Sequence, residues 1–512
     1  MISNAIRPKF EFFLDLIGFY AIGFFALLYI LFTRNFAEIK YDAHFFGFPI
    51  FIGEFLLFFC LGLLAVKWAA YGFKYSRISY LFLPYFIFVL VKVVMGYGKW
   101  GPLTLRDSAM FYYPVFAVFT YVFYRNSLMS IPALVLSAVA LIFLHFFNAS
   151  YVFSDFIFFL LATVVIFKIP QRAILKAVLA AALFLFSPYK LFFAASRTML
   201  VGNLAAIIFL VIAFFCCLNV KLRLKIAFLI PFFLCLVSLL IIFSPRNELK
   251  SLVSFRDLKD NYDETIKLIN DMEPGFKAEE IPPRLYNPEN NKRIDTLRHT
   301  EMAANDINPP LVYMPQQSLL KMPRAVTRAQ GTINGAPMVL TPTGSAPAVL
   351  APVPWNNPSF LSDSKQRSLE SAINTTLFRV FIWKDMLSEI YREKKYWFGF
   401  NFGKPLRSKS IEILQWAVKD WRHDGWITPH NSYLSLIYRS GAVGLLYIIA
   451  LMITLAIMIK RSIRSRSFAG ILACAILIDL LVTANFTLML ELPYNAIPFW
   501  ALFGTTLAYI RK

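Results

Sequence analysis

Long apolar runs, separated mostly by short polar stretches, dominate this chain of 512 residues. A helix needs about 20 apolar residues to cross the hydrocarbon core of a bilayer. Runs of about this length predict spanning helices near residues 12–32, 45–66, 78–97, 109–124, 129–147, 152–167, 173–193, 199–218, 225–243, 432–459, 468–489 and 494–510. The pattern therefore predicts an all-α fold, a polytopic membrane helix bundle with about twelve transmembrane helices.

One long polar stretch divides this bundle. Residues 1–243 are expected to form an N-terminal membrane bundle of about nine spans, and residues 432–512 a C-terminal membrane bundle of about three. Residues 244–431 between them are expected to form a large, mostly helical domain outside the membrane. Within it, residues 330–358 are rich in Pro, Ala and Gly, which predicts an irregular segment.

The domain outside the membrane also carries two helical patterns. Apolar residues recur at helical spacing over Val253–Met272 and over Leu369–Lys394. In the second pattern, one helix face collects the side chains of Leu377, Phe381, Ile382, Met386 and Ile390. We expect this face to pack against other elements of the domain.

Composition and charge support a membrane protein. Hydrophobic residues make up 58% of the chain and charged residues only 16%, against roughly 25% charged residues in an ordinary soluble protein. The net charge is +21, but Ser244–Pro429, with 25 basic and 21 acidic residues, contributes only +4 of it. The remaining excess lies mostly in short loops, as the positive-inside rule describes. We therefore expect membrane lipids as partners, and no nucleic acid.

The same loop charges predict the orientation. One set of short loops and termini holds 18 Lys and Arg residues, and the opposite set holds six. The richer side is expected to be cytoplasmic, which places both termini in the cytoplasm and the long polar stretch outside. The first span lacks a small-residue cleavage site after it, so we expect it to remain as a helix.

The sequence offers little for a metal or a cofactor. All five cysteines lie inside apolar runs, which argues against disulfides and cysteine-based zinc sites. The acidic residues of the short outer loops form no Asp-x-Asp pattern. We therefore expect neither a metal site nor a cofactor, although a metal-dependent sugar transferase is a competing interpretation that a chelator would test.

The first candidate for a catalytic segment is Pro429-His430-Asn431. Pro429 predicts a helix start with His430 in its first turn, just above the outer face of the membrane. Arg439, nine residues on, would lie roughly 13 Å further along that helix, at the interface. A histidine with an ordinary pKa of about 6.5 suits acid–base work, but one that merely caps a helix or bonds a loop is an equal alternative. His423, beside Asp424, is a rival base.

Two other segments place arginines at the outer face of the membrane, on the same side as His430. Arg197 follows Ser196 at the outer end of a predicted span, and Lys190 precedes it in the same short loop. Arg379 and Trp383 share one helix face. Guanidinium groups match phosphate oxygens with two hydrogen bonds. Lipid-headgroup contact for Arg197 and an exposed arginine on a packing helix for Arg379 are the simpler alternatives.

Together these elements resemble the superfamily of O-antigen ligases and Wzy-type O-antigen polymerases of the bacterial envelope. The matching elements, in order, are Ser196-Arg197, Arg379/Trp383, Gly399-Phe-Asn-Phe-Gly403, His430-Asn431-Tyr433-Leu434 and Gly441/Gly444-Leu445. Two features depart from the family pattern. The glycine spacing is stretched, and residues 246–363 have no counterpart.

The resemblance implies an inverting, metal-independent transfer of a glycan from a polyprenyl-pyrophosphate-linked donor. The acceptor would be a lipid A-core sugar (ligase) or another lipid-linked glycan (polymerase), at the periplasmic face of the inner membrane. It implies that Arg197 and Arg379 bind the pyrophosphate and that His430 orients or deprotonates the acceptor hydroxyl. Residues expected to contact substrate are Lys190, Arg439, Asn431, Trp383 and Tyr433.

Three other functions stay open. A protein-directed oligosaccharyltransferase would share the same chemistry. A transporter or flippase would make use of charges inside spans, for which the candidates are Glu54, Lys92, His145 and Asp479. A structural protein of the envelope would use the long polar stretch for docking, but it leaves the placement of the two arginines and His430 unexplained.

Overall fold

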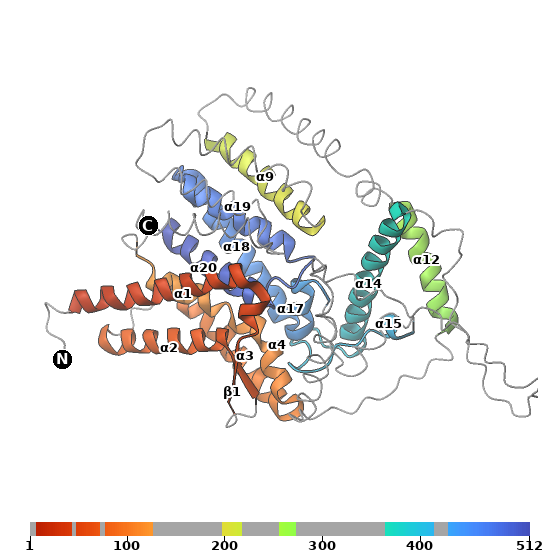
Figure 1. Cartoon of the computed structure of the whole chain (residues 1–512), viewed down its shortest axis with the longest axis horizontal. Helices are drawn as coiled ribbons and strands as arrows, with labels where there is room; N and C mark the ends of the chain where they lie inside the picture. Colours follow the sequence, from red (N-terminus) through yellow and green to blue (C-terminus); the bar gives the residue numbers. More distant parts are fainter. Residues whose placement is uncertain are drawn as a thin grey trace, which may run out of the picture.

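The computed structural model describes residues 7–43, 48–71, 77–125, 197–217, 255–272, 364–413 and 429–511, and these are mostly helical (Figure 1). The helices are α1 (Arg7–Ala37), α2 (Ile52–Tyr71), α3 (Arg77–Trp100), α4 (Pro102–Tyr112), α5 (Val115–Phe123), α9 (Arg197–Cys217), α12 (Phe255–Met272), α14 (Ser364–Arg392), α15 (Lys409–Ile413), α17 (Ser432–Ser440), α18 (Ala442–Arg464), α19 (Phe468–Thr483) and α20 (Pro493–Arg511). An antiparallel pair of strands, β1 (Lys40–Ala43) and β2 (Phe48–Phe51), lies between α1 and α2 in the chain. The helical fold class is confirmed, whereas the apolar run at 45–66 gave no sign of this hairpin.

Three of the described helices are long and apolar enough to cross a membrane, which indicates a membrane protein. They are Pro8–Ala37 within α1, Ile52–Tyr71 (α2) and Ala442–Arg464 (α18). Helices α9 and α19 contain shorter apolar stretches. Large apolar side chains such as Phe58 on α2 and Leu446 on α18 are exposed. Exposed apolar faces of this kind mark surfaces that contact lipid or protein.

Helix α20 holds the bundle together, because α1, α5, α18 and α19 all pack against it. Its Phe499 and Trp500 are fully buried and stack edge to face. Helix α9 packs closely along α19, and Gly202 allows the contact because a Cβ there would collide with Asp479 and Thr483. Small residues that let backbones approach are typical of helix packing in membranes.

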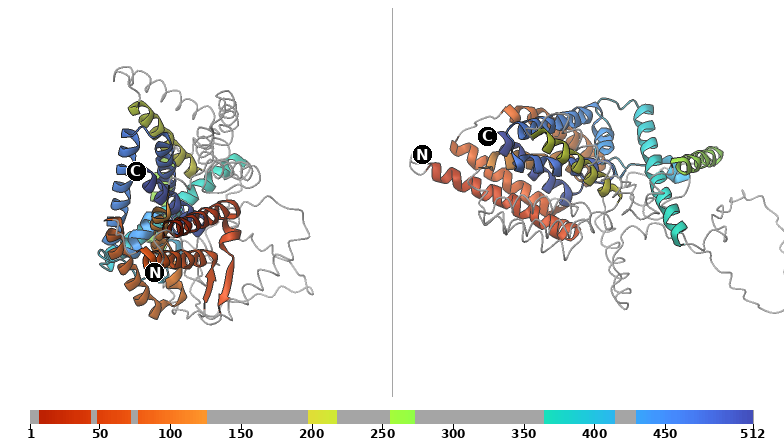
Figure 2. Two further views of the ribbon diagram at one scale, coloured as in Figure 1. Left: turned by 90° about the vertical axis from the view of Figure 1, so that its left-hand side faces the viewer. Right: turned by 90° about the horizontal axis from the view of Figure 1, so that it is seen from above.

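A second apolar core lies beyond one end of the bundle, in helices α12, α14 and α15, which we call the α14 cluster. All five side chains of the predicted apolar face, from Leu377 to Ile390, are buried in it. Tyr262 of α12 stacks on Phe381 of α14 with ring centroids 5.4 Å apart. The helices predicted over 253–272 and 369–394 are thus confirmed. Figure 2 shows the α14 cluster at the end of the bundle opposite to the beginning of α1.

The helix predicted at 109–124 is interrupted, because the structure has two short helices there, α4 and α5. The break falls at Pro114, which begins the second helix as its N-cap. A proline supplies no backbone N–H, and its ring collides with the carbonyl four residues earlier in a continuous helix. The helix is therefore interrupted between Tyr112 and Val115, although Tyr113 and Pro114 keep helical backbone angles.

The span predicted at 432–459 is also interrupted, at Gly441. This residue has φ +59°, and a Cβ on it would come within 2.5 Å of the carbonyl oxygen of Tyr396. Only glycine fits such a conformation without strain at this close approach, so α17 ends there and α18 begins. The spans predicted at 129–147, 152–167, 173–193 and 225–243 lie outside the described residues.

Candidate functional site

His430 lies just before α17, in a conformation that side chains rarely adopt. Its φ is +51°, in the left-handed region that costs an ordinary residue roughly 1–2 kcal/mol. The prediction that Pro429 starts a helix with His430 in its first turn is wrong. Asn431 is the N-cap, since its side chain accepts a hydrogen bond from the Leu434 N–H at 3.0 Å, and so His430 lies ahead of the helix.

Hydrogen bonds to neighbouring elements hold the His430 segment in this conformation. On the α14 side, the indole Nε1 of Trp383 donates to the carbonyl of Pro429 at 2.7 Å. On the bundle side, the backbone N–H of Ser432 donates to the carbonyl of Ala484 at 2.9 Å. A strained backbone conformation persists only where surrounding contacts hold it in place. Residues in such conformations cluster at functional sites.

The side chain of Tyr433 adds a third tie. Its hydroxyl donates to the carbonyl of Leu481 in α19 at 2.8 Å. Trp383, Asn431 and Tyr433 were all predicted from the sequence to contact substrate. Their polar atoms instead bond backbone groups of Pro429, Leu434 and Leu481, respectively. We interpret them as residues that position His430.

Arg379 lies one helical turn before Trp383 on α14, close enough to His430 to change its pKa. Burial and, second, the positive charge of Arg379 lower the pKa of His430 from 6.5 to about 4. Burial also lowers the pKa of the Arg379 guanidinium, although an arginine stays protonated in proteins. The pair is therefore a neutral imidazole beside a fixed positive charge at neutral pH.

Both side chains of this pair are half-buried. None of the described residues forms a hydrogen bond or an ion pair with either of them. A neutral imidazole can accept a proton, and a guanidinium can donate two parallel hydrogen bonds to an oxyanion. The arrangement thus places a proton acceptor, weakened by its lowered pKa, next to a site that can bind an anion.

The backbone of Arg197 lies at the same end of the bundle as His430. Arg197 is the first residue of α9, and Gly202, about one and a half turns on, lies against Thr483 at the end of α19. The residue after Thr483, Ala484, is the one that bonds to Ser432. The side chain of Arg197 and the whole of Lys190 lie outside the described residues. The structure thus brings Arg379 and His430 together and leaves the predicted convergence of Arg197 on them untested.

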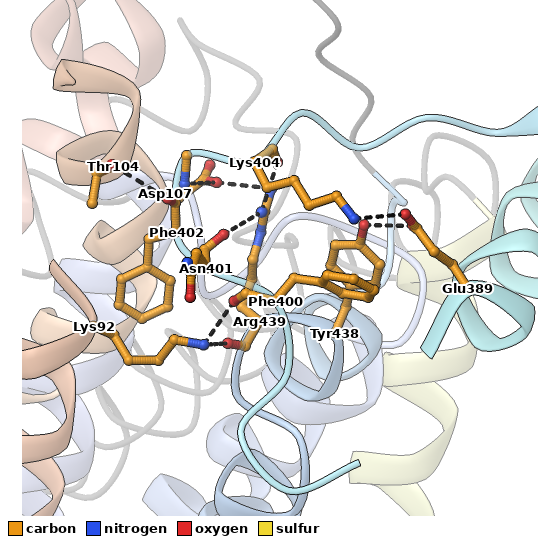
Figure 3. Close-up of polar contacts among 11 residues, drawn as sticks. Lys92, Thr104, Asp107, Glu389, Phe400, Asn401, Phe402, Lys404, Tyr438 and Arg439 are labelled. Atoms are coloured by element: carbon orange, nitrogen blue, oxygen red, sulfur yellow. Dashed lines mark hydrogen bonds and ion pairs between the residues drawn. The ribbon is translucent and has the colours of Figure 1, made fainter. Parts of the chain in front are cut away.

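Arg439 does not have the position expected of a phosphate ligand. Its side chain is 7% exposed. One terminal nitrogen pairs with Asp107 at 2.7 Å, and the other donates to the carbonyls of Asn401 at 3.1 Å and Lys404 at 2.7 Å (Figure 3). These three bonds engage both terminal nitrogens, so Arg439 fastens the loop after α14 to α4 and α17. This corrects its predicted role in binding substrate.

Lys92 fastens the same loop. Its ammonium group donates to the carbonyls of Phe398 at 2.6 Å, Phe400 at 2.7 Å and Arg439 at 2.8 Å. All three of its protons are therefore used, and Figure 3 shows the bonds to Phe400 and Arg439. From the sequence, Lys92 and Glu54 were candidates for charges that a transporter would use inside its spans. Glu54 accepts a hydrogen bond from Tyr112 at 2.6 Å.

The Gly399-Phe-Asn-Phe-Gly403 turn gains a structural explanation from these contacts. Gly399 has φ +60°, and a Cβ on it would come within 2.5 Å of the backbone N of Ser440. The N–H of Gly403 donates to Asp107 at 2.8 Å, while the Phe400 and Phe402 side chains between them are buried. The turn thus locks the end of α14 onto the break between α17 and α18.

No signal in the sequence identified Lys92 and Asp107 as parts of this lock, because their partners are backbone atoms and one arginine that lie remote in sequence.

With this geometry in view, the chain was compared with known proteins. Neither a protein-family model, nor a curated protein, nor a solved structure matches it. The function is therefore inferred from the arrangement of the chain's own residues.

Proposed function

We propose that this protein transfers a glycan from a polyprenyl-pyrophosphate-linked donor to an acceptor hydroxyl at the outer face of the bacterial inner membrane. The acceptor would be a lipid A-core sugar, as in an O-antigen ligase, or a second lipid-linked glycan, as in a polymerase. One observation carries the proposal: the imidazole of His430, held in a strained backbone conformation, lies beside the guanidinium of Arg379. A base and a fixed cation are what this reaction needs.

In the proposed reaction, the acceptor oxygen attacks the anomeric carbon of the donor glycan. His430 takes the proton of the acceptor hydroxyl as the new C–O bond forms, a role worth typically 10²–10⁴ in rate. The bond from the anomeric carbon to the pyrophosphate breaks with inversion, and its electrons leave with the lipid pyrophosphate. Arg379, with Arg197, stabilises that departing charge, and one such donor is commonly worth about 10²–10³ in rate. The step as proposed uses no metal and no cofactor.

The topology proposed with this function has about twelve spans, both termini in the cytoplasm and residues 244–431 in the periplasm. The arrangement of the described charges supports it. Lys67 at the end of α2 and Arg125 after α5 both pair with Asp15 near the start of α1. Arg511, near the C-terminus, lies 5.6 Å from the ring of Tyr121. These basic residues thus gather at the end of the bundle opposite to His430, as the positive-inside rule requires of a cytoplasmic end.

A transporter or flippase is the alternative from another class of protein. Of the charges that suggested it, Lys92 and Glu54 are engaged in hydrogen bonds within the described bundle, and Asp479 is buried in α19. Such groups serve equally well as polar contacts between helices. A protein-directed oligosaccharyltransferase remains a variant within the proposed chemistry.

The surface glycan of a deletion strain tests the proposed function. We expect the long glycan chains to be lost from the lipid A core if the protein is a ligase, and a core capped with a single repeat if it is a polymerase. Both effects are read on a gel of the extracted lipopolysaccharide. The wild-type gene must restore the profile, and an unchanged glycan in the deletion strain would contradict the proposal.

The pKa of His430 leads to a pH prediction. Transfer that needs a neutral imidazole should stay nearly constant from about pH 8 to about pH 5 and fall at lower pH with an apparent pKa near 4. Arg379→Gln removes the neighbouring charge and should move this limb to higher pH in the residual activity. An acid limb near 6.5 in the wild type would contradict the assignment.

The same shift has a consequence for stability. Because the pKa of His430 is lower in the folded protein than the ordinary 6.5, the unfolded chain binds more protons between pH 4 and 6.5. The free energy of unfolding therefore decreases as the pH falls through this window. His430→Asn should flatten that part of the stability profile.

A further inference from the structure

Residues 391–398 form a strongly exposed segment that links the end of α14 to the bundle. We call it the aromatic loop. Tyr391 is 75% exposed, Trp397 72% and Phe398 64%. Their neighbours Phe400 and Phe402, by contrast, are buried. Because large aromatic side chains gain most from leaving water, a dense group of exposed ones indicates a surface that is covered by something else.

The backbone of the aromatic loop lies at the beginning of the apolar helix α18. The carbonyl of Tyr396 accepts a hydrogen bond from Ala442 at 2.7 Å, and that of Trp397 accepts one from Val443 at 3.5 Å. Ala442 and Val443 are the first two residues of a helix that is long and apolar enough to cross a membrane. The loop is therefore fixed at the level where that helix would enter the bilayer.

The exposed surface around the loop continues onto membrane-facing helices. On α18, Leu445 and Leu446 are exposed directly beyond the loop. On α3, Val94 and Met95 are exposed, and Phe88 of the same helix lies 6.3 Å from the Phe398 ring. The aromatic side chains are thus continuous with an apolar surface on α18 and α3. Trp and Tyr are enriched at this level in membrane proteins, where their rings sit among the lipid headgroups.

The aromatic loop carries three positively charged residues, Arg392, Lys394 and Lys395. All three are exposed, and none of them forms an ion pair with a described residue. The helix ends in a turn in which Lys395 N–H donates to the carbonyl of Ile390 at 3.0 Å, with Lys394 at φ +53°. Glycine is the usual residue at such a position, so the lysine is kept there against its conformational preference.

We propose that the aromatic loop docks into the headgroup layer of the membrane that surrounds α18. Trp397 and Phe398 insert at the boundary between headgroups and acyl chains, and Lys394 and Lys395 bind anionic headgroups. The docked loop holds the end of α14, and therefore Arg379, at a fixed height above the bilayer. This inference rests on α18 as a membrane helix and does not depend on glycan transfer.

Site-directed spin labels in the full-length protein test the docking. In a cysteine-free chain, a cysteine is placed at Trp397, at Phe398 or, as the matched control, at Leu387. Leu387 is also exposed, but it lies about five residues, or roughly 7 Å of helix rise, before the end of α14. The protein is reconstituted in nanodiscs of phosphatidylethanolamine with phosphatidylglycerol, and the access of oxygen and of a water-soluble nickel chelate is measured.

Labels at positions 397 and 398 should be reached by oxygen more readily than by the nickel chelate, and the label at 387 should show the reverse. Equal access at all three positions would overturn the proposal, as would dipolar broadening that reveals a second copy on the loop. The double variant Lys394→Gln/Lys395→Gln should move the 397 label toward water in discs with phosphatidylglycerol, and should have no effect in phosphatidylcholine alone. An equal effect in both lipids would overturn the role of the lysines.

Discussion

Replacing His430 with Asn is expected to lower glycan transfer by about 10²–10⁴-fold while the protein remains folded. Asn tolerates the left-handed backbone that His430 adopts, so the segment before α17 keeps its conformation. The amide cannot accept the proton of the acceptor hydroxyl. Transfer is measured as the amount of long-chain surface glycan restored to a deletion strain, with expression matched to the wild type.

Two further variants act as controls for this prediction. His430→Gly removes both the imidazole and the backbone strain. It should therefore transfer no more glycan than His430→Asn, even if the relief of strain makes the protein more stable. His423→Asn removes the rival base, which lies outside the described residues, and should transfer at the wild-type level. A loss in His423→Asn together with full transfer in His430→Asn would assign the base to His423 instead.

Replacing Asp107 with Leu is expected to destabilise the fold by about 3–5 kcal/mol. The change leaves the guanidinium of Arg439 buried without its counter-ion, and it also removes the acceptor of the Gly403 N–H. The loop that joins α14 to the bundle would lose its attachment to α4. Thermal unfolding of the purified protein in detergent measures the loss.

The chain provides graded controls for the Asp107 variant. Asp107→Asn keeps an acceptor for both partners and should lose less. The double variant Asp107→Leu/Arg439→Met removes both buried charges and should recover part of the stability. Glu38→Gln breaks an exposed pair with Arg34 and should change stability by less than about 1 kcal/mol. Equal losses for Asp107→Leu and Glu38→Gln would show that the buried pair does not hold the loop.

Local patterns made much of this fold predictable from the sequence. The helix over 369–394 and its buried face from Leu377 to Ile390 follow from apolar spacing alone, because a helix repeats every 3.6 residues. The breaks at Pro114 and Gly441 were missed, although both residues are known helix breakers. Each lies inside an otherwise continuous apolar run, and hydropathy averaged over a window hides single residues of this kind.

The candidate site was predictable only in part. The family resemblance implied that Arg379 and His430 act at one site, and in the structure Arg379 lies close enough to lower the pKa of His430. The left-handed backbone of His430 was not expected. Nor were the bonds of Trp383 and Tyr433 to backbone carbonyls. Every residue has a carbonyl, so a sequence cannot show which one a distant side chain will reach.

The same reason explains why the partners of Lys92 and Arg439 were not predicted. A charge in an apolar run is commonly a functional group, and an arginine at an interface commonly meets an anion. Here Lys92 donates its three protons to carbonyls of one loop and of Arg439, and Arg439 is held by two carbonyls of that loop and by Asp107. Their cost of burial is offset by hydrogen bonds that fix the end of α14, on which Arg379 lies.

The most direct measurement is the reaction of the purified protein in nanodiscs with a polyprenyl-pyrophosphate-linked glycan. Lipid A-core and a second lipid-linked repeat are offered as acceptors, and an excess of chelator is present. We predict that an inverted glycosidic bond forms to one of them, that free polyprenyl pyrophosphate appears in equal amount, and that His430→Asn abolishes both. If the donor stays intact, or merely crosses the bilayer, or if the chelator stops the reaction, the imidazole and guanidinium are not the centre of a metal-independent transferase.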